Sequence, residues 1–185
     1  MKIRKALTLS GSIRTSSLNT RLALAMEEKL SNAGLQTTSI NLGDYPLALF
    51  NADIEKADGE PENAVTLAEL FSTADVIFIA SPEYNGSVSA LLKNTLDWIS
   101  RQKNAPYTRA VFGIGAASPG KMGGVKGLGH LRDILNNMGA LVAPSTLGVG
   151  NGGDAFDDGG AFRDEAINKR AENLISQLTR ISRDI

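Results

Sequence analysis

The sequence predicts a single α/β domain built on a doubly wound, five-stranded parallel sheet. Short apolar runs of strand length alternate along the chain with segments whose apolar residues recur at helical spacing. Two of the runs, Val76–Ala80 and Val111–Gly115, are uninterrupted, as is typical of strands covered by helices on both faces. The segments after the first, third and fourth strands are rich in Gly, Ser and Pro, so we expect a ligand site at that rim of the sheet.

The first part of the chain is expected to form strand, helix and strand. The apolar run 6–9 predicts the first strand, and helical spacing predicts a helix over 17–32 that Gly34 ends. Alternation over 36–42 predicts a weak second strand. The proline in the apolar segment 45–51 keeps that segment out of a helix.

The middle of the chain is expected to place the third strand between two helices. The charged segment 53–62 is interpreted as a surface loop, and Pro61 suits the first turn of the helix that follows. Val76–Ala80 is the third strand. The turn-forming cluster 81–87 then leads into a helix whose apolar residues fall over 91–99.

The last part of the chain continues the alternation. The fourth strand, 111–115, opens into a Gly- and Ser-rich loop, and a helix over 128–138 follows. Leu141–Ala143 begins the fifth strand. The glycine- and aspartate-rich segment Gly148–Gly160 is interpreted as a loop, and the sequence does not indicate its role. Apolar residues at helical spacing over 167–181 predict the last helix.

Length and composition indicate one soluble globular domain covering residues 1–185. The chain is 42% hydrophobic and 21% charged, and its net charge of −1 predicts no overall attraction to nucleic acid or to a membrane. The N-terminal apolar run is too short for a signal peptide and no run reaches transmembrane length, so we expect a cytoplasmic protein. Because the chain has no cysteine, any redox reaction requires a bound cofactor.

The turn between the first strand and the first helix is predicted to bind a phosphate. The first N–H groups of a helix lack internal partners, and the helix dipole favours an anion at that end. Serine hydroxyls, an asparagine and an arginine crowd residues 10–19, which contain no acidic residue. The simpler alternative is that Ser16, Ser17 or Asn19 only caps the helix.

The same turn differs from two common nucleotide-binding loops. It lacks the glycines of the G-x-G-x-x-G arrangement, and Ser16 stands where a G-x-x-x-x-G-K-[ST] loop has its second glycine. Hydroxyls and a guanidinium in place of glycine amides favour a terminal phosphate monoester over a bridging pyrophosphate. This favours FMN over NAD as the bound nucleotide.

Other motifs are interpreted as having no catalytic role. Residues 115–121 satisfy G-x-x-x-x-G-K, but Met122 cannot ligate Mg²⁺ and Pro119 lacks an amide, so a P-loop nucleotidase is disfavoured. His130, the single histidine, is interpreted as a surface or interface residue. The aspartates of 154–158 lack the spacing of a calcium loop, and we predict no metal site.

Three motifs, two of them directly after strands and one within a predicted helix, form a set. Residues 11–19 read GSIRTSSLN, residues 81–87 read SPEYNGS, and residues 92–98 contain LKN followed by DW. Together they resemble the NADPH-dependent FMN reductase family, flavodoxin-like flavoproteins that include quinone, azo-dye and chromate reductases. GKMGG at 120–124 is similar to the family's third loop, where members often carry Arg in place of Lys121.

The resemblance covers nearly the whole chain and implies a flavodoxin-like three-layer sandwich that binds FMN. The implied phosphate-binding residues are Ser12, Arg14, Ser17 and Asn19, with Leu18 in the same cofactor-binding segment. The implied residues around the isoalloxazine ring are Pro82, Glu83, Tyr84, Asn85 and Gly86, with Ser118 at the other edge. The family also implies a homodimer or homotetramer with the ring near a subunit interface.

Three of the ring residues carry more specific expectations. Asn85 and Gly86 tolerate the unusual backbone angles needed to aim N–H groups at the ring. Tyr84 either covers the ring, packs against a partner subunit or is a wall aromatic without a chemical role. Glu83 is interpreted as an ion-pair or subunit contact in preference to a catalytic acid.

The residues and the resemblance together predict an FMN-dependent oxidoreductase. It would take a hydride from NADPH or NADH and pass electrons to a quinone, an azo compound, a metal oxyanion such as chromate, or free flavin. Because the flavin carries the hydride, no catalytic side chain is required. The alternative is a non-enzymatic, flavodoxin-like electron carrier. Such carriers tend to be strongly acidic, so the net charge of −1 and Lys121 favour an enzyme.

Overall fold

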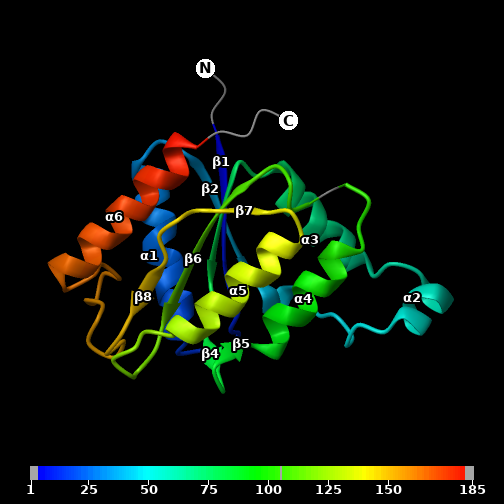
Figure 1. Cartoon of the computed structure of the whole chain (residues 1–185), viewed down its shortest axis with the longest axis horizontal. Coiled ribbons are helices and arrows are strands. Elements are labelled where there is room, and N and C mark those ends of the chain that lie inside the picture. The colour runs from blue at the N-terminus through cyan, green and yellow to red at the C-terminus, as the bar shows by residue number, and fades with distance from the viewer. Residues whose placement is uncertain (1–3, 105, 182–185) are drawn as a thin grey trace.

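The computed structural model describes residues 4–104 and 106–181, which form a parallel sheet between two layers of helices (Figure 1). The strands lie in the order β2 (Gln36–Asn41), β1 (Lys5–Ser10), β3 (Val76–Ala80), β6 (Val111–Ala117) and β7 (Leu141–Val142). All four pairings along this order are parallel. The predicted doubly wound, five-stranded sheet is therefore confirmed.

The remaining elements cover the sheet or extend its rim. The helices of the described residues are α1 (Leu18–Asn32), the 3₁₀ turn η1 (Leu42–Asp44), α2 (Ala52–Asp58), α3 (Glu62–Thr73), α4 (Ala90–Ser100), α5 (Val125–Asn137) and α6 (Glu165–Arg180). The other strands are β4 (Glu83–Tyr84), β5 (Ser87–Val88) and β8 (Leu147–Val149). Helices α1 and α6 lie on one face of the sheet, and α3, α4 and α5 lie on the other (Figure 1).

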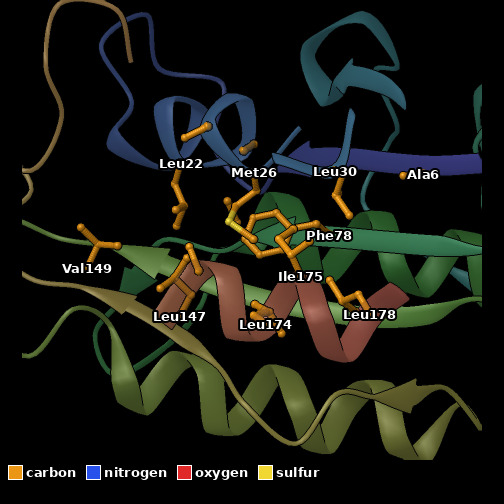
Figure 2. Close-up of a cluster of buried hydrophobic side chains, with 14 of the residues drawn as sticks. Ala6, Leu22, Met26, Leu30, Phe78, Leu147, Val149, Leu174, Ile175 and Leu178 are labelled. Atoms are coloured by element: carbon orange, nitrogen blue, oxygen red, sulfur yellow. The ribbon is translucent and has the colours of Figure 1, made fainter. Parts of the chain in front are cut away.

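Alternating side chains of the central strands build one core on each face. On β3, Phe78 points to the α1 and α6 side, whereas Ile77 and Ile79 point to the α3, α4 and α5 side. Figure 2 shows Phe78 packed among leucines of α1 and α6. Because β3 is fully buried on both faces, its uninterrupted apolar run needs no polar alternation.

The charged segment predicted to be a loop contains a helix instead. Helix α2 buries none of its residues, so it shows no apolar periodicity. The start of α2 is marked in the sequence by its N-cap residue, Asn51, whose side chain accepts a hydrogen bond from the Asp53 N–H at 2.8 Å. Gly59, with a φ of 82°, ends the helix. An ion pair of 2.9 Å between Arg101 and Glu55 ties α2 to the end of α4.

The fifth strand is interrupted, which the sequence did not predict. Strand β7 pairs with Val111–Phe112, and β8 pairs with Gly115–Ala117, both in parallel with β6. Pro144, which has no N–H, lies between the two pieces. The predicted loop at Gly148–Gly160 therefore begins inside a strand, and its first two residues belong to the sheet.

The turn-forming cluster after β3 is a small hairpin. Strands β4 and β5 pair antiparallel around Asn85 and Gly86, whose φ angles are 52° and 80°. Positive φ at both central residues is the requirement of a two-residue hairpin turn, and the tolerance predicted for these two residues is confirmed. In the part of the chain described here, no helix combines the length and the apolar character needed to cross a membrane.

Candidate functional site

The loops after β1, β3 and β6 meet around a cavity of about 240 Å³ at the carboxyl ends of these strands. Its walls are Ser12, Arg14, Ser16, Ser17, Leu18, Asn19, Pro82, Glu83, Tyr84, Ala117, Ser118 and Pro119. Every residue proposed for the cofactor lines it except Asn85 and Gly86, which form the hairpin turn beyond the wall. Ser16, Ala117 and Pro119 were not in the proposed set, although each directly neighbours a member of it.

The first loop is shaped by its own hydroxyl groups. The Ser17 side chain caps α1 by accepting a hydrogen bond from the Thr20 N–H at 3.3 Å. The Ser12 hydroxyl accepts one from the Arg14 N–H at 3.4 Å, and the Ser10 hydroxyl accepts one from the Ser12 N–H at 3.2 Å. Ser17 thus fulfils the simpler alternative of a helix cap and still lines the cavity.

The same loop keeps free donors at the mouth of the cavity. Among residues 4–104 and 106–181, the exposed guanidinium of Arg14 has no hydrogen-bond or ion-pair partner. The N–H groups of Ser16, Leu18 and Asn19 likewise bond to no described residue. The first turn of α1 contains no acidic residue. Free amides, a free cation and the positive end of a helix dipole together fit a phosphate.

Asn19 joins the first loop to the third. Its side-chain N–H₂ donates to the Ala117 carbonyl at 3.0 Å, and its oxygen accepts from the Ala117 N–H at 2.9 Å. The side chain is buried, and its amide makes a hydrogen bond through each of its two ends. Asn19 is therefore a brace between two walls, and its backbone N–H is the part left to face a phosphate.

Glu83 connects the hairpin to α5. One carboxylate oxygen accepts a hydrogen bond from the Gly127 N–H at 2.8 Å, in the first turn of the helix. A Cβ at position 127 would lie 3.3 Å from Glu83 Cβ, so the glycine lets the hairpin approach the helix closely. The structure therefore uses Glu83 as a helix cap, a role that neither the ion-pair nor the acid expectation included.

The third loop does not form a P-loop. Residues Gly115–Ala117 of the G-x-x-x-x-G-K match lie in β6, paired with β8, so the first three of its seven residues are extended strand. The Ser118 hydroxyl, at the cavity wall, donates to the Gly120 carbonyl at 3.0 Å. His130 is exposed and lies 3.0 Å from the Ser87 hydroxyl of the hairpin, as expected for a surface residue.

Comparison with known proteins shows that this chain is similar to NADPH-dependent FMN reductases and quinone reductases. The family model described as NADPH-dependent FMN reductase matches residues 4–154. A quinone reductase of Escherichia coli K12 is 35% identical over 139 residues, which are 75% of this chain and 72% of that protein. An NADPH:quinone oxidoreductase of Arabidopsis thaliana is 36% identical over 177 residues, 92% of this chain and 87% of that protein.

A solved structure shows the same fold. The flavoenzyme FerB, an NAD(P)H:(acceptor) oxidoreductase from Paracoccus denitrificans, superposes with a TM-score of 0.79. The superposition covers 98% of this chain and 100% of FerB, at 21% sequence identity. At that identity the likeness concerns the fold, and it confirms the flavodoxin-like sandwich expected from the sequence.

Proposed function

The chain belongs to the NADPH-dependent FMN reductase family, and from this we propose that it is an FMN-dependent oxidoreductase that oxidises NADPH or NADH. Its electron acceptor is a small molecule. Among quinones, azo compounds, metal oxyanions and free flavin, we propose a quinone first, because relatives in both Escherichia coli and Arabidopsis thaliana are named for quinones. The observation that carries the proposal is the cavity with free anion donors at the carboxyl ends of β1 and β3, where the strand order reverses.

The first loop would hold the phosphate of FMN. Arg14 offers a guanidinium that no other group of the described chain occupies, and the amides of Leu18 and Asn19 point from the start of α1. The buried hydroxyls of Ser12 and Ser17 line the same wall. Without a ligand, the hydrogen that each of these groups can donate would have no acceptor in the described chain or would bond to water. A dianionic phosphate monoester suits these donors better than a neutral group does.

The second and third loops would hold the ring. Pro82, Glu83 and Tyr84 form the wall supplied by the hairpin, and Ser118 and Pro119 form the wall after β6. When bound, the flavin supplies hydride acceptance and electron donation to the second substrate. The chain itself orients the ring: the hairpin is fixed by its turn and by the Glu83 cap, and the third loop is fixed by the Asn19 brace.

We further propose that the protein is a cytoplasmic homo-oligomer, a dimer or a tetramer. Large apolar side chains stand exposed in the hairpin, where Tyr84 is 46% accessible, and between the third loop and the start of α5, where Met122 is 74% and Val125 48% accessible. Exposed apolar side chains of this size suit either a second subunit or an apolar acceptor. Family membership disfavours the alternative of a non-enzymatic electron carrier, since both relatives described above are named as reductases or oxidoreductases.

Reconstitution tests the proposal directly. The purified protein, incubated with FMN and desalted, should retain flavin absorbance in the visible range and should melt at a higher temperature than the apoprotein. It should then oxidise NADPH or NADH in steady state when a benzoquinone is supplied. Failure of excess FMN either to bind or to raise the melting temperature would overturn the proposal. FMN binding without any NAD(P)H oxidation would instead favour an electron carrier.

A further inference from the structure

Three alternate glycines lie against the backbone of the third loop. Gly148, Gly150 and Gly152 run from β8 into the segment that follows it, and we call them the glycine ladder. Their neighbours across the gap are main-chain atoms of residues 118–123, the loop that carries Ser118 and Pro119 at the cavity wall. Backbone therefore packs on backbone beside the proposed ring site.

Hydrogen bonds hold the two segments in this position. The Ser118 N–H donates to the Val149 carbonyl at 3.0 Å, and the Gly152 N–H donates to the Ser118 carbonyl at 2.9 Å. The Asn151 N–H donates to the Gly120 carbonyl at 3.2 Å. The third loop thus continues the β6 and β8 pairing beyond the strands, and its main chain is held by the segment that follows β8.

The close approach depends on the missing side chains. A Cβ at Gly150 would overlap the Lys121 carbonyl oxygen and lie 2.8 Å from the Lys121 carbonyl carbon. A Cβ at Gly148 would lie 3.2 Å from the Gly123 carbonyl oxygen. None of the three ladder glycines has a positive φ, so these residues are required for space and not for backbone angle.

Gly152 touches two walls of the cavity at once. A Cβ there would lie 2.7 Å from Leu18 Cδ1 and 3.1 Å from the Ser118 carbonyl oxygen. Leu18 lines the cavity from the first loop and Ser118 lines it from the third. Gly152 itself is buried. A side chain at this position would have to displace the Leu18 side chain and the Ser118 carbonyl group.

We propose that the glycine ladder is a set of positioning residues that places the third-loop wall of the cofactor cavity. This inference rests on the proposed function, because the cavity is taken to hold FMN. None of the ladder glycines lines the cavity; they act through the main chain of Ser118–Gly123 and, at Gly152, also through the Leu18 side chain. It also gives a role to the first part of the segment Gly148–Gly160, which sequence alone left open.

The test compares three alanine variants of the full chain by FMN titration of the apoprotein. Gly150→Ala must displace backbone, and we expect it to weaken FMN binding about tenfold or more. Gly152→Ala meets one movable side chain and one carbonyl, and we expect a smaller loss. Gly153→Ala is the matched control, because nothing lies within 4 Å of a Cβ there. It should bind FMN as the wild type does.

Riboflavin, which lacks the phosphate, separates an effect on the ring wall from an effect on the phosphate-binding loop. Because the ladder supports the proposed ring wall, Gly150→Ala should weaken riboflavin and FMN binding by the same factor, at a temperature where melting shows the apoprotein to be folded. If Gly150→Ala does not fold, the same comparison on Gly148→Ala decides, because a Cβ there meets only the backbone of Met122 and Gly123. Wild-type FMN affinity in the folded ladder variants would overturn the inference. Absence of FMN binding in the wild type and in Gly153→Ala would instead overturn the proposed function.

Discussion

The polar residues of the cavity divide by whether the chain already uses them. Ser17, Asn19 and Glu83 each make a hydrogen bond that fixes a loop or caps a helix. The Arg14 side chain makes none within the described chain, and its guanidinium stands exposed at the wall. At the scale of single residues, Arg14 is therefore the side chain whose contribution to binding is separable from its contribution to structure.

Replacing Arg14 should distinguish FMN from riboflavin, which differs by the phosphate alone. A charge-assisted hydrogen bond contributes about 1.5–3 kcal/mol, so Arg14→Ala should weaken FMN binding roughly 10- to 100-fold. Riboflavin binding should change little. Arg14→Lys should recover only part of the affinity, because an ammonium cannot reproduce the guanidinium fork. Fluorescence titration of the apoprotein with both flavins measures these changes.

Arg170→Ala is the control for Arg14→Ala. Arg170 is an exposed arginine of α6, outside the residues that line the cavity. Its replacement should leave both affinities unchanged. A parallel loss of riboflavin and FMN affinity in Arg14→Ala would show that Arg14 maintains the loop, and the phosphate assignment would then be wrong.

A second residue-scale prediction concerns an unpaired hydroxyl in the core. Thr8 of β1 is fully buried, and its hydroxyl has no hydrogen-bond partner among the described residues. Thr8→Val keeps the branched shape and removes the polar atom, so it should raise the free energy of unfolding by about 1–2 kcal/mol. Urea denaturation measures it. Thr38→Val, at an exposed position of the edge strand β2, should change stability by less than about 0.5 kcal/mol.

At the scale of elements, capping and turn residues determine the short helices and strands that apolar periodicity does not predict. Helix α2 has no buried residue, and its signals are Asn51 before it and Gly59 after it. The hairpin of β4 and β5 follows from its turn residues, although each strand has only two residues. The start of α5 has a glycine at its N-cap and no capping side chain of its own, so it depends on Glu83 from the hairpin.

Glu83→Ala should therefore destabilise the contact between α5 and the hairpin. Loss of a cap typically lowers the free energy of unfolding by about 0.5–2 kcal/mol, and the Glu83 carboxylate also faces the positive end of the helix dipole. Glu83→Gln retains an acceptor oxygen and should restore most of the loss. Urea denaturation at neutral pH measures both variants. Glu60→Ala, in an exposed loop, is the control, and equal stability of Glu83→Ala and Glu60→Ala would contradict the assignment.

At the scale of the whole molecule, one carboxylate joins the central strands at their amino ends, opposite the cavity. Asp75 precedes β3, accepts a hydrogen bond from the Lys5 N–H of β1 at 2.8 Å and pairs with Arg109 before β6. Burial alone would raise the pKa of Asp75, but the hydrogen bonds from Lys5 and Arg109 outweigh burial and lower its pKa below 3.8.

Because folding lowers the pKa of Asp75, ionised Asp75 stabilises the folded state. A carboxyl whose pKa is lowered by folding contributes stability that is present above its unfolded pKa, near 3.8, and is lost as the pH falls through the folded value. Asp75→Asn should therefore be less stable than the wild type at pH 7, and the difference should shrink below pH 3.8. Urea denaturation across this range measures it. Asp58→Asn, at an exposed position, should follow the wild type, and a pH-independent effect of Asp75→Asn would refute the linkage.

The sequence by itself determined the sheet, the helices that cover it and the rim that carries the cavity. The apolar runs of β3 and β6 and the apolar spacing in α1 are local patterns. A strand buried on both faces is apolar at successive residues, and a helix buried on one face is apolar at every third or fourth residue. The phosphate loop is equally local, since its polar side chains and the helix start adjoin in the chain. Short elements without buried faces, such as α2, were not predicted, because they have no apolar residues at helical spacing.

The tertiary structure alone decided which polar groups are free and which are occupied. Asn19 meets Ala117 across 98 residues, and Glu83 meets Gly127 across 44, so no local pattern distinguishes them from free ligands. The glycine ladder is likewise visible only where the chain returns beside the third loop. Hydrogen bonds and close backbone contacts are properties of pairs, and folding brings together pairs that lie far apart in the sequence.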